Sequence, residues 1–237
     1  IHSEQEPPGA PPSSPTPGRL VPLDDLSHLS PAERERAFGL AAVQLLMHPS
    51  ARKHGAAYAT TALQHLARAL QAGADDPEVH AALARLLWQS NPDQSNLHAR
   101  RVLAAKEASA DARGTALFAL ARAAGSRNVV DAIPYWEQLV RIRRYGDAWH
   151  ALGRGYFNQG RLQEAIATGE EALCVAGGRD PLTAVQAARE IGICHCMLGQ
   201  YTEGLEELGA ALDRARSAAD EVNAAYIALD MGTAEMS

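Results

Sequence analysis

The residues of this 237-residue chain that could most readily do chemistry are Cys194, His195 and Cys196, which follow one another directly. A Cys-x-Cys pair beside a histidine can bind a metal ion or take part in redox reactions. The surrounding sequence has helical spacing, however, and residues i and i+2 of a helix point about 200° apart. Because both sulfur atoms cannot then reach one ion, we expect one cysteine in the core, the other lining a groove, and no metal or cofactor.

Two further patterns invite a chemical interpretation. Gly153-Arg154-Gly155 resembles the start of a phosphate-binding loop, but the third glycine is misplaced and no strand precedes it. The one local basic cluster consists of Arg141, Arg143 and Arg144. These arginines fall in the last turn of an expected helix, where cations interact favourably with the helix dipole, and an acidic partner is the alternative. With no nucleophile, paired-carboxylate or zinc signature in the sequence, we expect no enzyme.

The composition favours a helical protein with protein partners. Hydrophobic residues make up 46% of the chain and aromatic residues 5%, which suits helices packed through alanine rather than a β-rich fold. The net charge of −6 gives no reason to expect nucleic acid or an anionic membrane surface. No apolar stretch approaches the roughly 18–20 residues of a membrane span.

The chain begins at Ile1 and holds only three cysteines, too few for a disulfide framework. A first residue other than methionine indicates a processed protein or an excised fragment. We therefore expect an extracytoplasmic or secreted protein, with the cytoplasm as the alternative.

The elements that position these residues are helices. Residues 1–29 form a Pro/Ser-rich segment that should be extended, and residues 30–237 form the helical region. Ser30-Pro31-Ala32-Glu33 predicts a helix start, with an N-cap serine, a proline at the first position and a capping-box glutamate. Helices over about 31–47 and 55–71 follow, and then helical stretches of about 13–17 residues alternate with short turns. We expect about eleven helices.

An internal repeat organises these helices. Its best copy has Trp149, Leu152-Gly153 and Tyr156 on one helix, a turn glycine at Gly160, and Ala165-Ile166 with Ala172-Leu173 on the next helix. Small residues occupy positions where two helix backbones approach, and large ones fill the spaces between. Weaker copies lie upstream, and a clear copy follows at Ile191-Gly192, Tyr201, Gly204-Leu205 and Ala211-Leu212.

This pattern resembles the tetratricopeptide repeat (TPR), whose period is about 34 residues. The resemblance covers about residues 31–237. It implies an all-α, right-handed superhelical solenoid of about five helix hairpins plus a final helix, with a concave face.

In this family the inner positions of the first helix of each pair bind partners. Transferred to this sequence, the partner-binding groove consists of Glu78, Arg85, Trp88, Asp147, His150, Arg154, Phe157, Gln186 and Arg189. Arginines mixed with aromatic residues suit an extended peptide that carries polar and apolar groups.

We therefore expect a non-enzymatic scaffold that binds protein or peptide segments. A specific form is a homo-oligomer or filament, in which the tail of one copy lies along the next solenoid. The tail-docking residues are Pro7, Pro8, Pro11, Pro12, Pro15 and Pro17. The alternative is a TPR sensor arm of a larger bacterial regulator.

Overall fold

The computed structural model describes residues 28–46 and 54–236, and every regular element within them is a helix. Ten helices form five consecutive hairpins: α1 (Pro31–Leu46) with α2 (Gly55–Gln71), α3 (Pro77–Leu87) with α4 (Pro92–Ala104), α5 (Ala110–Gly125) with α6 (Ile133–Ile142), α7 (Gly146–Asn158) with α8 (Leu162–Ala176), and α9 (Pro181–Met197) with α10 (Tyr201–Ser217). A last helix, α11 (Glu221–Glu235), follows, and a short 3₁₀ helix, η3 (Val129–Ala132), precedes α6. The expectation of an all-α hairpin array is confirmed.

The helix ends follow from local sequence. At the start of α1 the backbone N–H of Ser30 donates to Glu33 Oε2 at 2.8 Å, and Glu33 N–H donates to Ser30 Oγ at 3.3 Å, as the capping-box pattern predicts. Turns after α2, α7 and α9 contain glycine with positive φ, for example +96° at Gly73 and +78° at Gly199. Because this backbone conformation strains other residues, glycine at these positions permits the tight turns between helices.

The helices of a pair approach closely through glycine. A Cβ atom placed on Gly153 would lie 2.9 Å from Thr168 Oγ1, and one placed on Gly192 would lie 3.0 Å from the carbonyl oxygen of Gly204. Both distances are shorter than ordinary van der Waals contact. The glycines of the repeat therefore permit the α7–α8 and α9–α10 contacts, as expected from the sequence.

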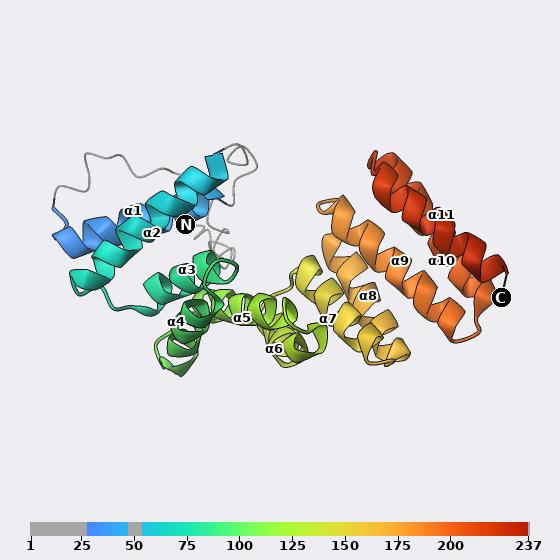
Figure 1. Ribbon diagram of the computed structural model, residues 1–237, viewed down its shortest axis with the longest axis horizontal. Helices are drawn as coiled ribbons and strands as arrows, with labels where there is room; N and C mark the ends of the chain where they lie inside the picture. Colours follow the sequence, from blue (N-terminus) through green and yellow to red (C-terminus); the bar gives the residue numbers. More distant parts are fainter. Residues whose placement is uncertain (1–27, 47–53, 237) are drawn as a thin grey trace, which may run out of the picture.

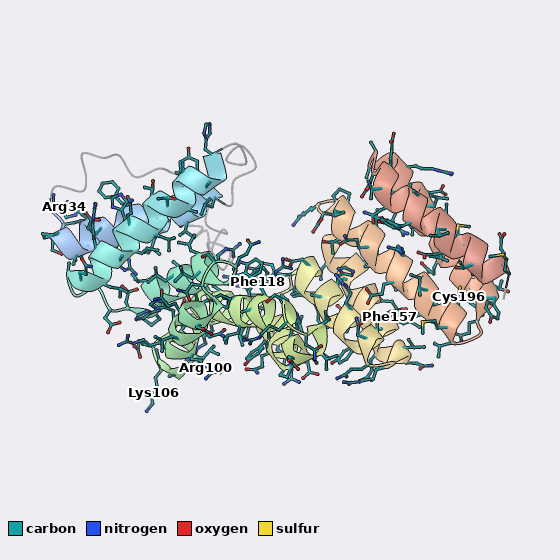
Figure 2. All side chains as sticks on the ribbon, viewed as in Figure 1. Arg34, Arg100, Lys106, Phe118, Phe157 and Cys196 are labelled. Carbon is teal, nitrogen blue, oxygen red and sulfur yellow. The ribbon has the colours of Figure 1, made fainter. Side chains whose placement is uncertain are left out.

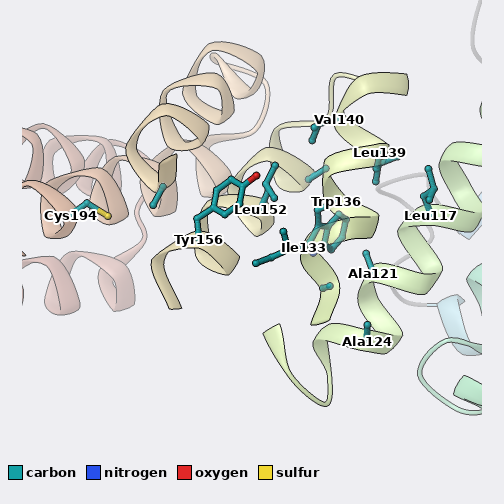
Figure 3. Packing of buried hydrophobic residues seen from close by; sticks show 13 residues of the cluster. Leu117, Ala121, Ala124, Ile133, Trp136, Leu139, Val140, Leu152, Tyr156 and Cys194 are labelled. Carbon is teal, nitrogen blue, oxygen red and sulfur yellow. The ribbon is translucent and has the colours of Figure 1, made fainter. Parts of the chain in front are cut away.

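The core runs along the solenoid from pair to pair. Its central part contains Leu117 of α5, Trp136 and Leu139 of α6, and Leu152 and Tyr156 of α7 (Figure 3). The Tyr156 hydroxyl donates to Glu137 Oε1 at 2.8 Å at the edge of this cluster. Burial and that carboxylate raise the pKa of Tyr156 to about 12. Each pair thus buries its apolar residues only against its neighbours, as in other repeat proteins.

The pairs follow an open curve with α1 and α2 at one end and α11 at the other (Figure 1). The first helices of successive pairs pack on one another at α3–α5, α7–α9 and α9–α11. At the centre the arrangement differs, because α7 packs mainly against α6 and η3.

Candidate partner-binding groove

Two recesses lie along the first helices of the pairs, and Arg154 lines both. The first, which we call the polar recess, has a volume of about 430 Å³. It is lined by His150, Arg154, Phe157 and Asn158 of α7, Gln186, Arg189, Glu190 and Ile193 of α9, and Asn223 of α11. The second, which we call the aromatic recess, has a volume of about 310 Å³. Its lining comes from α3, α5, η3, α6 and α7 and includes Trp88, Arg122, Val129, Trp136 and Ala151.

Charged groups in the polar recess are held by partners on neighbouring helices. His150 Nε2 lies 3.3 Å from Glu190 Oε2, and both side chains are 13% exposed. Arg189 Nε donates to Asp230 Oδ2 at 2.5 Å, and its guanidinium lies 5.3 Å from the centroid of the Tyr226 ring. Arg154 is exposed and has no ion pair within the described residues. Among the described residues, Arg154 is therefore the arginine of this recess that no ion pair holds.

Arginines and aromatic rings alternate beside the aromatic recess. The Arg122 guanidinium lies 4.9 Å from the Trp88 ring centroid and 5.9 Å from that of Phe118. The Arg85 guanidinium also lies over the Phe118 ring, 5.4 Å from its centroid. Phe118 projects from α5 and Phe157 from α7 (Figure 2). Such cation–π contacts order the arginine side chains and leave an aromatic surface beside them.

Asp147 lies near the arginines beside the aromatic recess. Its side chain is exposed, yet the surrounding helices remove water from the carboxylate, which raises the pKa of Asp147 above its ordinary value. The positive charges of Arg122 and Arg85 act in the opposite direction. Burial likewise lowers the pKa of Arg85, which is only half-buried.

The structure brings most of the predicted groove residues together. His150, Arg154, Phe157, Gln186 and Arg189 all line the polar recess. Trp88 lines the aromatic recess, and Arg85 and Asp147 lie near its arginines. Glu78 is placed differently, because its carboxylate lies 3.9 Å from Arg36 of α1 and takes part in the contact between the first two pairs.

Several groove residues were missed by sequence reasoning. Phe118 and Arg122 of α5 each lie 32 residues before His150 and Arg154, so the repeat period could have identified them. No pattern pointed to Glu190 or Asn223, because their position depends on how α9 and α11 pack.

The three residues of the cysteine cluster lie in the α9–α10 pair. Cys194 is fully buried, and burial together with Glu190 raises the pKa of its thiol to about 12. Cys196 is half-buried, and its sulfur faces α10 at Gly204. His195 Nδ1 lies 2.8 Å from Gln200 Oε1. Within residues 28–46 and 54–236, no three histidine, cysteine or acidic side chains are grouped so that they could hold a metal ion.

The two remaining motifs are also part of the packing. Gly153, Arg154 and Gly155 lie inside helix α7, and a Cβ atom on Gly155 would meet Ile133 Cγ1 at 2.6 Å. Arg143 pairs with Asp111, and Arg144 Nη2 lies 3.1 Å from Glu171 Oε2.

The predicted tail-docking prolines, from Pro7 to Pro17, lie outside the described residues, as does nearly all of the segment 1–29. None of the described helices has the length and apolar character needed to cross a bilayer.

Comparison with known proteins identifies the fold. No protein-family model matches the sequence, and no curated protein sequence does either. Solved structures do match. MamA aligns with a TM-score of 0.58 and 18% identity over 73% of this chain and 97% of its own chain. A TPR protein of Thermus thermophilus aligns with a TM-score of 0.53 and 20% identity, over 82% and 99%. PilF of Pseudomonas aeruginosa aligns with a TM-score of 0.54 and 17% identity, over 84% and 92%.

These matches show that the chain folds as a TPR solenoid over most of its length.

Proposed function

We propose that this TPR-fold solenoid is a non-enzymatic scaffold that binds an extended segment of a protein partner along its concave face. The observation that carries the proposal is the position of Arg154 between two recesses of different chemistry. An extended segment presents alternate side chains at regular intervals, so one side chain can enter each recess. The aromatic recess suits a proline or another apolar group. The polar recess and Arg154 suit a carboxylate or an amide.

One candidate occupant is the N-terminal segment of a second copy of this chain. Residues 1–22 contain seven prolines, which favour an extended polyproline conformation and lower the entropy lost on binding. Glu4 and Glu6 lie close to the first prolines and match the arginines of the face. Binding of one copy's tail by the next copy is a head-to-tail contact, which produces rings or filaments.

A labelled synthetic peptide of residues 1–22 tests the binding site. We expect saturable binding to the intact chain by fluorescence anisotropy. Binding should weaken by about tenfold or more in Arg154→Ala and in Trp88→Ala, because each removes an anchor of one recess. Arg214→Ala, an exposed arginine on α10, is the matched control and should leave binding unchanged. Equal binding by all three variants would remove the recesses as the site.

A deletion tests the assembly. The chain that lacks residues 1–20 should have a lower mass than the intact chain by light scattering, while its helical circular dichroism signal stays the same. If both chains have the same mass, the tail does not join copies, and the groove is occupied by a different partner.

A further inference from the structure

The two recesses differ in how their charges are balanced. In the polar recess Glu190 lies 3.3 Å from His150, and the guanidinium of Arg189 pairs with a carboxylate of α11. The aromatic recess contains Arg122 and Arg154, and none of the described residues that line it is acidic. Neither arginine has an ion pair with a described residue. The lining of the aromatic recess therefore carries two positive charges that it does not itself neutralise.

The two arginines occupy equivalent places in consecutive helix pairs. Arg122 lies on α5 and Arg154 on α7, which are the first helices of the third and fourth pairs. They are 32 residues apart in the sequence, close to the repeat period of about 34 residues. Both side chains are exposed. A segment that crosses from one pair to the next along these helices therefore passes both arginines.

One carboxylate offsets part of this charge from outside the recess. Asp147 of α7 interacts electrostatically with Arg122 and with Arg85, but it is not among the residues that line the recess. Arg154 pairs with no described carboxylate. The recess therefore keeps an excess of positive charge, and an incoming carboxylate would find both arginines at its edge.

Tryptophan side chains lie beside the two charges. The Trp88 ring centroid lies 4.9 Å from the Arg122 guanidinium, and Trp136 also lines the recess. The Trp136 ring meets the Phe118 ring edge to face, with the centroids 5.7 Å apart, which holds it in place. Aromatic walls of this kind suit a proline ring, as in other grooves that recognise polyproline segments. The recess thus offers neighbouring sites for a carboxylate and for a proline.

The N-terminal segment contains a dipeptide with this chemistry. Residues 1–22 include two acidic residues, Glu4 and Glu6, and only Glu6 is followed directly by a proline, Pro7. A proline restricts the residue before it to extended backbone conformations. The carboxylate and the proline ring are therefore presented together with little loss of conformational freedom on binding.

We propose that the aromatic recess binds the Glu6-Pro7 dipeptide of a second copy of this chain. The Glu6 carboxylate accepts hydrogen bonds from Arg122 and Arg154, and such charge-assisted bonds are stronger than neutral ones. The Pro7 ring packs against Trp88. This inference rests on the binding of an extended segment proposed above, and it adds the residue of that segment that determines its register.

A set of peptides tests the role of Glu6 on the intact chain. The peptides span residues 1–22 with an amidated C-terminus, so that Glu4 and Glu6 carry their only carboxylates. We expect Glu6→Gln to weaken binding by about tenfold or more in fluorescence anisotropy at low salt, and Glu4→Gln by less than about twofold. The effect of Glu6→Gln should shrink as added salt screens the charges.

Variants of the chain locate the carboxylate through double-mutant cycles. Arg122→Gln should weaken binding of the native peptide and reduce the tenfold effect of Glu6→Gln to about threefold or less, because the same contact cannot be lost twice. Arg154→Gln should act in the same way. Arg100→Gln removes the same charge from an exposed position of α4, which does not line the recess, and should leave the effect of Glu6→Gln unchanged. Because these arginines are exposed, circular dichroism melting should show that all three variants fold.

Light scattering identifies the source of the bound dipeptide. Glu6→Gln in the intact chain should lower the average mass, as deletion of residues 1–20 should. Glu4→Gln is the matched control and should leave the mass unchanged, since it removes the same charge from the same segment.

The results separate this proposal from the proposed function. Coupling of Glu6 to both Arg122 and Arg154, with a lower mass of the Glu6→Gln chain, supports it. Equal binding of the native and Glu6→Gln peptides overturns it, while the proposed function stands. If neither peptide binds, the N-terminal segment is not the occupant and both are overturned for that segment. Coupling without a change in mass means that the recess holds the chain's own segment, which overturns a second copy as the occupant.

Discussion

Replacement of Gly204 by alanine tests the close backbone contact between α9 and α10. A Cβ atom at this position would meet the Cys196 sulfur and would lie 2.9 Å from the carbonyl oxygen of Gly192 and 3.0 Å from the backbone nitrogen of Cys196. The sulfur can rotate away, but the two backbone atoms belong to helix α9 and cannot move alone. Helices α9 and α10 must therefore separate, or the new methyl group must remain compressed.

The expected cost follows from overpacking, which typically destabilises a protein by about 1–3 kcal/mol. Gly209, in the same helix, provides the matched control because a Cβ atom there would meet nothing within 4 Å. Gly209→Ala gains only the helix propensity of alanine, about 0.5–1 kcal/mol. For a chain of this size about 1 kcal/mol corresponds to about 2–4 °C in Tm. We expect thermal melting by circular dichroism to show a lower Tm for Gly204→Ala and a slightly higher Tm for Gly209→Ala.

A double variant identifies the atoms responsible. Cys196→Ala removes the sulfur but leaves the Gly192 carbonyl oxygen in place, so it should rescue Gly204→Ala only in part. Full rescue would mean that the sulfur alone resists the methyl group. A Gly204→Ala protein at least as stable as Gly209→Ala would refute the close approach of the two helix backbones.

Three further predictions concern packing, thiol chemistry and pH. Ala165→Leu places a large side chain at a buried position of α8 and should cost about 1–3 kcal/mol in urea unfolding, whereas unchanged stability would show that the repeat register is wrong. Iodoacetamide should label the exposed Cys174 in the native protein but Cys194 only after unfolding, because Cys194 is buried and its thiol pKa of about 12 keeps it protonated; rapid native labelling of Cys194, detected by mass spectrometry, would contradict its burial. The pKa of His98 is lowered by burial and by the charge of His80, 2.8 Å away between the Nδ1 atoms. The unfolded chain then takes up a proton near pH 6.5 that the folded chain still excludes, so the free energy of unfolding should fall as the pH drops below about 6.5. His98→Asn should remove this part of the pH dependence in urea titrations, and an unaltered dependence would assign it to other groups.

The sequence predicts the fold well because its signals are local. The capping box at Ser30 and Glu33 and the turn glycines Gly73 and Gly199 each act within a few residues of the chain. The spacing from Trp149 to Tyr156 fixes which side of α7 faces the core, so the predicted groove residues of α7, His150, Arg154 and Phe157, meet in one recess.

The remaining features depend on contacts between distant segments. Arg36 pairs with Asp76 and Arg189 with Asp230, across 40 and 41 residues. No sequence pattern determines such pairs, since they depend on the angle at which successive helix pairs stack. The same holds for Glu78, which by its repeat position belongs to the groove but lies beside Arg36 of α1.

The central junction of the solenoid has a mechanical consequence. Because α7 meets the preceding pair mainly through α6 and η3, this joint is built differently from its neighbours. Trp88 and Arg122 lie on one side of the joint and Ala151 and Arg154 on the other, so the width of the aromatic recess follows the angle between the two halves. Bending of the solenoid at this joint and binding of a ligand in the recess are therefore thermodynamically linked. A ligand that fits the recess at one width favours the joint angle that gives this width. In return, a force that changes the angle changes the affinity for the ligand.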